Sequence, residues 1–313
     1  MKFVTLNQIA PWTEDFFFMP YGNRDELVIC NPQDSVCVSP AFLRSRKSLE
    51  EHIRLVNENH IKRAMIVGEN IEFLQRCLSL EEITVYPSIN AVNFDFSPLY
   101  DMPNLRKLIC QTTYGPNEEH TSYVDYSKFS SLSELIINGP KGHKNVHLVR
   151  GLTHLALENG QPTTRTLVGA FDGEKLEELS LTESTISSLD GVEQANKIRR
   201  LELYYNRKLV DISALTRVRD TLKELDIENC GKIRDFSVLS TLHRLEKLRM
   251  VGNNSLPDLS FIQEMPNLKS FTLTMNVEDG NLDMCMSIPY VSIRNRKHFN
   301  RRDDEFSKID IRG

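Results

Sequence analysis

Apolar residues recur along the chain in a short phrase, apolar-x-x-apolar-x-apolar, that returns about every 23 residues. The first residues of the five clearest copies are 22, 24, 23 and 23 positions apart. These copies are Leu176-Leu179-Leu181, Ile198-Leu201-Leu203, Leu222-Leu225-Ile227, Leu245-Leu248-Met250 and Leu268-Phe271-Leu273. A fixed period of this length predicts a repeat architecture, in which each unit packs mainly against its neighbours.

Weaker copies extend the pattern in both directions and bring the total to eleven units between residues 61 and 293. The added copies are Ile61-Ala64-Ile66, Leu80-Ile83-Val85, Leu105-Leu108-Cys110, Leu132-Leu135-Ile137, Leu152-Leu155-Leu157 and Ile288-Val291-Ile293. The early starts are 19, 25, 27, 20 and 24 residues apart. We expect the extra residues of the longer units to form loops on the outer side or at the edges.

Each phrase predicts a short strand whose fourth and sixth positions point into the core, which leaves the third, fifth and seventh on the other face. The second half of the clear units steps by three, as in Leu209-Ile212-Leu215-Val218, and this spacing predicts 3₁₀ returns. Three residues after the last core position stand Asn206, Cys230, Asn253 and Asn276. We expect these four side chains to be buried and to bond to neighbouring backbone turns.

The 22–24-residue units resemble the internalin-type leucine-rich repeats of bacteria, clearly over residues 176–273 and more weakly over 61–175. The resemblance implies an α/β fold, a leucine-rich repeat solenoid with a curved parallel sheet and short helical or 3₁₀ returns. It also implies a binding role. We divide the chain into an N-terminal capping subdomain (residues 1–60), the solenoid (61–293) and a C-terminal cap or tail (294–313).

Two features of the first 60 residues predict regular structure outside the repeats. The apolar run 26–30 indicates a strand. Ser48 followed by Glu51 forms a capping-box pattern that predicts a helix through about Asn57, with Ile53 and Val56 on its apolar face.

The exposed positions of the middle repeats carry carboxylates and tyrosines, and they form our candidate partner-binding face. Its residues are Glu158, Glu178, Arg200, Glu202, Tyr204, Tyr205, Glu224, Asp226, Glu228 and Arg249. In the early repeats the same positions hold Met65, Val67 and Thr84. Six carboxylates on adjacent strands repel one another, and a partner with a basic surface would relieve that repulsion. The alternative is an ordinary solvated face, on which Arg200 neutralises Glu178 or Glu224.

Composition narrows the function classes. A net charge of −5 argues against a general nucleic-acid binder. There is no run of about 20 apolar residues of the kind that spans a membrane. The basic start and apolar core of an export signal are also missing, so we expect a cytoplasmic protein. Six scattered cysteines without paired spacing predict free, mostly buried thiols and no zinc site.

Three motifs contain residue types that often carry chemistry, and none of them predicts an enzyme or a cofactor. Residues 139–144 lack the spacing and the hydroxyl residue of a phosphate-binding loop. His143 and His147 would share a metal only on one helix, and no Glu follows His143. Cys110 occupies a core position of its repeat. The basic run 294–302 is followed at once by three acidic residues, which favours a polar cap over a phosphate contact.

We therefore expect a non-catalytic module that binds another protein on its inner sheet face. A sharper version is a bacterial immunity protein that neutralises a toxin. The alternatives are an intracellular scaffold or regulator and a translocated effector that acts in a host cell.

Overall fold

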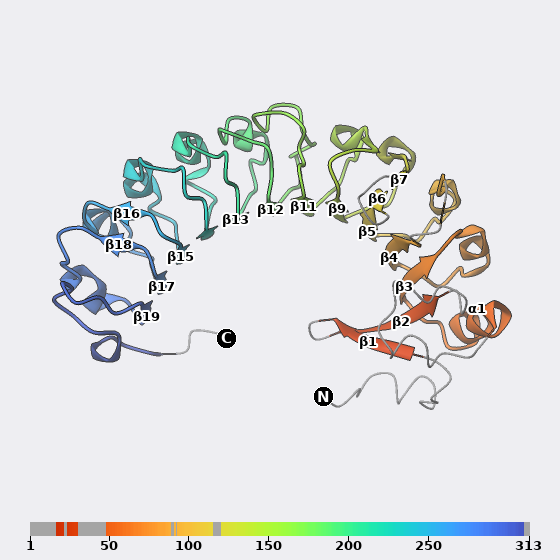
Figure 1. Ribbon diagram of the computed structural model, residues 1–313, viewed down its shortest axis with the longest axis horizontal. Coiled ribbons are helices and arrows are strands. Elements are labelled where there is room, and N and C mark those ends of the chain that lie inside the picture. Colours follow the sequence, from red (N-terminus) through yellow and green to blue (C-terminus); the bar gives the residue numbers. More distant parts are fainter. Residues whose placement is uncertain are drawn as a thin grey trace. The chain divides into compact units, whose positions relative to one another are not determined.

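The computed structural model describes residues 17–21, 24–30, 48–88, 91, 93–114 and 120–309. The chain divides into two compact units, unit 1 (Met1–Val149) and unit 2 (Arg150–Gly313). In each unit, parallel strands lie side by side and short helical returns lie on the opposite side (Figure 1). In the described part of the chain, no helix is long and apolar enough to cross a membrane.

Unit 1 carries the sheet order β1-β2-β3-β4-β5-β9, in which only the β1–β2 pair is antiparallel. Its elements are β1 (Phe17–Tyr21), β2 (Arg24–Cys30), α1 (Leu49–Glu58), β3 (Arg63–Gly68), η3 (Glu72–Arg76), β4 (Glu82–Pro87), η4 (Ser97–Leu99), β5 (Lys107–Gln111), β6 (Thr113–Tyr114), β7 (His120–Thr121), β8 (Val124–Asp125), η5 (Tyr126–Lys128), β9 (Glu134–Asn138), β10 (His143–Lys144) and η6 (Val146–Leu148). The longest repeat spacing places its extra residues at the β6–β7 hairpin, directly after β5.

Unit 2 carries the all-parallel order β11-β12-β13-β14-β15-β17-β19. Its elements are β11 (His154–Glu158), β12 (Glu178–Thr182), η7 (Val192–Gln194), β13 (Arg200–Tyr204), η8 (Ser213–Val218), β14 (Glu224–Glu228), η9 (Ser237–Thr241), β15 (Lys247–Val251), β16 (Ser255–Leu256), η10 (Ser260–Glu264), β17 (Ser270–Leu273), β18 (Asn276–Val277), η11 (Asp283–Ser287), β19 (Tyr290–Ile293) and η12 (Asp303–Glu305).

The apolar phrase forms the core as the spacing predicts. All three phrase residues of all eleven repeats are buried. Strands β11 to β14 alternate half-buried and buried positions, and β12 to β15 place Leu179, Leu201, Leu225 and Leu248 in register. The predicted 3₁₀ returns are also confirmed, because Leu209, Ile212, Leu215 and Val218 are buried along η8 and its approach. The strand residues Leu179, Leu201, Leu225 and Leu248 stack from repeat to repeat and so determine which side chains face outward.

A recurring aspartate begins many of the returns. In the pattern Asp-apolar-Ser, the carboxylate accepts a hydrogen bond from the serine amide two residues later, as in helix capping. The motif occurs as Asp95-Ser97, Asp125-Ser127, Asp211-Ser213, Asp235-Ser237 and Asp258-Ser260. These hydrogen bonds lower the pKa of Asp125, Asp211, Asp235 and Asp258, so these four carboxylates are charged at neutral pH.

The buried polar positions are confirmed for Asn206 and Cys230 and wrong for Asn253 and Asn276. Asn206 binds Ser184 and the Leu181 carbonyl, and the Cys230 thiol lies 3.4 Å from the Leu203 carbonyl.

Gly252, with φ +146°, lengthens the next turn by one residue. The buried side chain there is therefore Asn254, which donates to the carbonyls of Cys230 and Ile233, and Asn253 is exposed. Asn276 lies in β18, where alternation buries Met275 and Val277 and leaves Asn276 to contact Ser255.

The N-terminal predictions hold where residues are described. The predicted strand lies within β2, and Ser48 and Glu51 form both hydrogen bonds of a capping box at α1. Ile53 and Val56 are buried. Cys77, Cys110, Cys230 and Cys285 are free and buried, as expected, whereas Cys37 and the side chain of Cys30 lie outside the described residues.

The inner face of unit 1 differs from the sequence prediction. Met65, Val67 and Thr84 are buried rather than exposed. Met65 and Val67 pack with Val28 and the half-buried Tyr86, because both faces of β3 are apolar. An open, polar inner face is therefore found on unit 2 and not on this part of unit 1.

Candidate functional site

The ten predicted side chains all lie on unit 2, and the register places nine of them in three rows across β11–β15. The first row is Glu178, Arg200 and Glu224; the second is Glu202, Asp226 and Arg249; the third is Glu158, Tyr204 and Glu228. Tyr205 stands one residue beyond β13. The structure thus brings these residues together on adjacent strands, as predicted; that they bind a partner stays a prediction.

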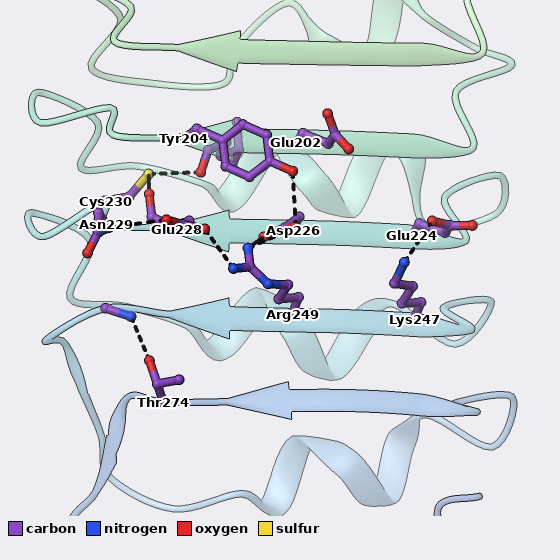
Figure 2. A network of polar contacts seen from close by, with 12 residues as sticks. Glu202, Tyr204, Glu224, Asp226, Glu228, Asn229, Cys230, Lys247, Arg249 and Thr274 are labelled. Carbon is purple, nitrogen blue, oxygen red and sulfur yellow. Dashed lines mark hydrogen bonds and ion pairs between the residues drawn. The ribbon is translucent and has the colours of Figure 1, made fainter. Parts of the chain in front are cut away.

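A polar network links the second and third rows (Figure 2). Arg249 Nη1 lies 2.8 Å from Asp226 Oδ1, and its Nη2 lies 2.7 Å from Glu228 Oε2. The Tyr204 hydroxyl donates to Asp226 at 3.1 Å, and the Tyr205 hydroxyl donates to Glu228 at 3.0 Å. One guanidinium and two tyrosines therefore hold both carboxylates in fixed positions.

Arg200 pairs most closely with Glu202, which was not expected, and more loosely with Glu224, which was. Its Nε donates to Glu202 Oε1 at 2.8 Å, on its own strand, whereas the distance from its Nη1 to Glu224 Oε2 is 3.9 Å. Residues two apart on a strand point to the same face, so Arg200 and Glu202 can pair without a neighbouring strand. Glu178 instead contacts His154 Nε2 at 3.2 Å. The expected ion pair between Arg200 and Glu224 is therefore present, but at the limit of ion-pair distance.

Burial and pairing pull the ionisation of this network in opposite directions. Burial raises the pKa of Asp226, and the hydrogen bond from Arg249 only partly offsets that rise. Burial and the neighbouring Asp226 carboxylate raise the pKa of Tyr204 well above its usual value. For Arg249, burial lowers the pKa, but hydrogen bonds to Glu228 and Asp226 outweigh it and raise the pKa overall. Arg249 and Tyr204 thus both favour the charged form of Asp226 against the effect of burial.

The inner face of unit 2 is less negative than its carboxylates alone indicate. Arg200, Arg249 and Lys247 all lie among the carboxylates, and Lys247 Nζ is 3.7 Å from Glu224. Much of the repulsion that a basic partner would relieve is already relieved within the chain. The face is better described as an ordered surface of mixed charge with two tyrosines.

Cys110 and His143, two of the candidate residues for chemistry in unit 1, meet at the buried Tyr126. The Cys110 thiol lies 2.8 Å from the Tyr126 hydroxyl, which lies 2.9 Å from His143 Nδ1. Burial raises the pKa of Cys110 to about 12 and lowers that of His143 to about 4. A thiol this difficult to ionise is a poor nucleophile, so the cluster is suited to packing.

His143 and His147 do not lie on one helix. His143 is in strand β10, and His147 is exposed in η6. Among the described residues, no group of three or more His, Cys, Asp or Glu could hold a metal ion. The loop before β10 packs tightly, since a Cβ on Gly142 would lie 2.0 Å from the Ser122 carbonyl oxygen.

A groove of about 480 Å³ lies on the return side of unit 2, between η9 and η10. Phe236, Leu256 and Phe261 contribute apolar surface, and Asp235 and Asp258 line it while serving as caps. These carboxylates have lowered pKa values, mainly from the serine hydrogen bonds, so they are set up as caps and not as general acids.

The basic C-terminal run covers the end of unit 2. Phe299 and Phe306 are buried, and the Val291 amide donates to the Ser307 carbonyl. Arg301 pairs with Asp283 at 2.7 Å and with Glu305 at 3.3 Å. Within the run, Arg301 is therefore engaged by carboxylates of the chain itself.

One further residue, Glu183, directly follows β12 beside this surface and was not among the residues predicted from the sequence. It occupies the same position in its repeat as Tyr205, and both have positive φ. The usable signal was Asn159 and Asn229 at that position in the flanking repeats, because Asn tolerates a left-handed backbone.

Parallel strands with 3₁₀ returns and an apolar phrase in register make the fold a leucine-rich repeat solenoid. A leucine-rich repeat protein from Leptospira interrogans shares this fold with 16% sequence identity and a TM-score of 0.53, covering 80% of this chain and 70% of that one. An internalin from Listeria monocytogenes aligns with 14% identity and a TM-score of 0.49, covering 85% and 84% of the two chains. At these identities the likeness describes the fold alone.

No family model matches the chain. Mitochondrial ATP synthase subunit s from Pongo abelii is 31% identical over 107 residues, which is 32% of this chain and 52% of that protein. The chain therefore spans about half the length of this curated relative.

Proposed function

We propose that the protein is a non-catalytic binding module that holds another protein on the inner sheet face of unit 2. The observation that carries the proposal is the network of Arg249, Asp226, Glu228, Tyr204 and Tyr205. Its side chains rise from rigid, paired strands and hold one another in place. A partner would thus meet a preorganised surface and lose little free energy to ordering it.

The partner that fits this surface presents mixed charge with basic groups in excess, since six carboxylates face three permanent cations across β11–β15. Exposed tyrosine and arginine are also the side chains that most often dominate binding energy at protein interfaces. The finer version of the proposal is an immunity protein that covers a basic toxin in the cytoplasm of the producing bacterium. Intracellular scaffolding and action in a host cell remain the competing roles.

The test begins with affinity capture from the native cell and then measures the purified partner by calorimetry. Arg249→Ala should weaken binding by about tenfold or more, because it removes a central arginine and loosens two carboxylates. The matched control is Arg217→Ala. Arg217 also bridges two carboxylates, Asp190 at 3.5 Å and Glu193 at 2.9 Å, but it lies on the return side in η8.

Equal affinities for the two variants would remove the inner face of unit 2 as the binding surface. The immunity role has its own test, since stoichiometric addition of the protein should abolish the activity of a captured toxin. Fractionation of the native cell tests the cytoplasmic location, and recovery from a host cell or the medium would favour the effector role.

A further inference from the structure

A row of left-handed residues follows the strands that carry the candidate site. Asn159, Glu183, Tyr205 and Asn229 directly follow β11, β12, β13 and β14, with φ between 49° and 56°. Each occupies the same position in its repeat. Asn is among the few residues that adopt this backbone readily, whereas Glu and Tyr pay a steric cost there.

The sheet itself requires this conformation. The Glu183 amide donates to the Tyr204 carbonyl at 2.9 Å, and the Tyr205 amide donates to the Glu228 carbonyl at 2.8 Å. Asn159 and Asn229 make the same bond to the following repeat. The turn therefore fixes the backbone whatever the side chain, and two adjacent repeats hold residues that this backbone disfavours.

The two side chains make few contacts that would explain their presence. Glu183 is exposed, and among the described residues its carboxylate makes no hydrogen bond or ion pair. Tyr205 is 41% exposed, and its hydroxyl donates to Glu228, the one polar contact of this side chain within the described part of the chain. Residues held in a disfavoured backbone conformation cluster at functional sites.

We propose that Glu183 and Tyr205 form an anchor for an arginine side chain of the bound partner. Adjacent strands of a sheet lie about 4.8 Å apart, so the ring and the carboxylate stand on neighbouring repeats within reach of one guanidinium. A guanidinium stacks on an aromatic face and pairs in plane with a carboxylate, which a lysine ammonium does less well. Glu228, fixed by Arg249, adds negative charge at the hydroxyl end of the ring.

This inference rests on the proposed function and gives the chemistry of one contact in it. The probe is a nine-residue peptide of alternating glycine and arginine, titrated into the ¹⁵N-labelled full chain. Two matched peptides carry lysine or citrulline in place of arginine. We expect amide shifts centred on residues 183, 205 and 229, with an affinity for the arginine peptide about threefold or more above that for the lysine peptide. Equal affinities for arginine and lysine, or shifts spread evenly over the three rows, would overturn the anchor.

Two variants separate the ring from the hydroxyl. Tyr205→Leu should lower the affinity for the arginine peptide about threefold, and Tyr205→Phe should leave it within twofold of the original. If Tyr205→Phe weakens binding as much as Tyr205→Leu, the hydroxyl and not the ring is the contact, and the stacking model is wrong.

Glu183→Asn should change affinity and stability in opposite directions, a combination expected only if Glu183 is both strained and functional. It should weaken the arginine peptide and at the same time raise the melting temperature by about 2 °C, because Asn suits the left-handed backbone. The control is Glu174→Asn, which removes an exposed carboxylate from unit 2 where φ is not positive and should change neither quantity. An unchanged melting temperature for Glu183→Asn would refute the strain argument.

The natural partner distinguishes this anchor from the wider proposal. If Arg249→Ala weakens the partner and Glu183→Asn does not, the inner face binds the partner and the anchor is wrong. If neither variant affects the partner, the proposed function itself fails.

Discussion

Asn206 offers a quantitative test of how neighbouring repeats are tied together. Its side chain is fully buried and accepts from the Ser184 amide at 2.9 Å and from the Ser184 hydroxyl at 2.5 Å. Its amide nitrogen donates to the Leu181 carbonyl at 2.7 Å. Asn206→Ala removes all three bonds and leaves the buried Ser184 amide unpaired, while the Leu181 carbonyl stays within the β12–β13 ladder.

The expected cost follows from those groups. A buried backbone group left without a partner costs about 1–3 kcal/mol. One such group, together with the lost bond to the Leu181 carbonyl at about 1 kcal/mol, gives a loss of about 3 kcal/mol for Asn206→Ala, since the Ser184 hydroxyl is able to rotate toward another acceptor. Cys230 fills the same position one repeat later, but its thiol makes only long contacts, 3.4 Å to the Leu203 carbonyl and 3.6 Å to the Glu228 carbonyl. Cys230→Ala should therefore cost about 1 kcal/mol, mainly from lost packing.

Equilibrium unfolding in urea, followed by circular dichroism, measures both losses. The comparison is valid if the slope of free energy against urea stays constant across the variants. Asn206→Cys, which copies the next repeat, should lie between the two alanine variants. The reasoning is refuted if Asn206→Ala costs no more than Cys230→Ala, because the amide would then contribute no more than a thiol.

The remaining predictions concern ionisation and capping. Burial lowers the pKa of His143 to about 4, below an unfolded value of about 6.5, so its contribution is complete above pH 6.5 and lost as the pH falls toward 4. Stability should drop by up to about 1.4 kcal/mol per pH unit in that window from this group, and His143→Gln should show a slope smaller by that amount. A parallel pair of slopes would show that His143 is not the titrating group. Asp258→Ala should cost about 1 kcal/mol through loss of the 2.6 Å bond to the Ser260 amide. Asp220→Ala, on a side chain that is 88% exposed, is its control and should leave the unfolding midpoint unchanged.

The fold could be predicted because one short phrase specifies both the strand and its buried positions. Leu179, Leu201 and Leu225 lie in register as the spacing requires, and the step of three in the returns identifies the 3₁₀ turns. Register then determines which charged residues share a row. This is why nine of the ten candidate residues could be placed on one face without knowledge of any contact.

Details that depend on a single backbone angle could not be predicted in the same way. Gly252 lengthens one turn and moves the buried amide from Asn253 to Asn254. The left-handed position of Glu183 leaves no periodic signal in hydrophobicity. Partner choice within the charged rows was also out of reach, since Arg200 selects Glu202 on its own strand over carboxylates across the sheet. Long side chains have several partners at similar distance, and sequence spacing does not rank them.

The alternation along each strand separates stability from recognition in unit 2. The core depends on positions four and six, which are buried in every repeat, while positions three, five and seven carry the rows of charge. Because a repeat contacts mainly its neighbours, a changed inner-face residue perturbs two or three strands and leaves the other repeats intact. The inner face can thus vary widely on an unchanged core. If the proposed function is correct, Glu183 and Tyr205, which lie on a left-handed backbone that such residues rarely adopt, are the first positions to test for contact with a partner.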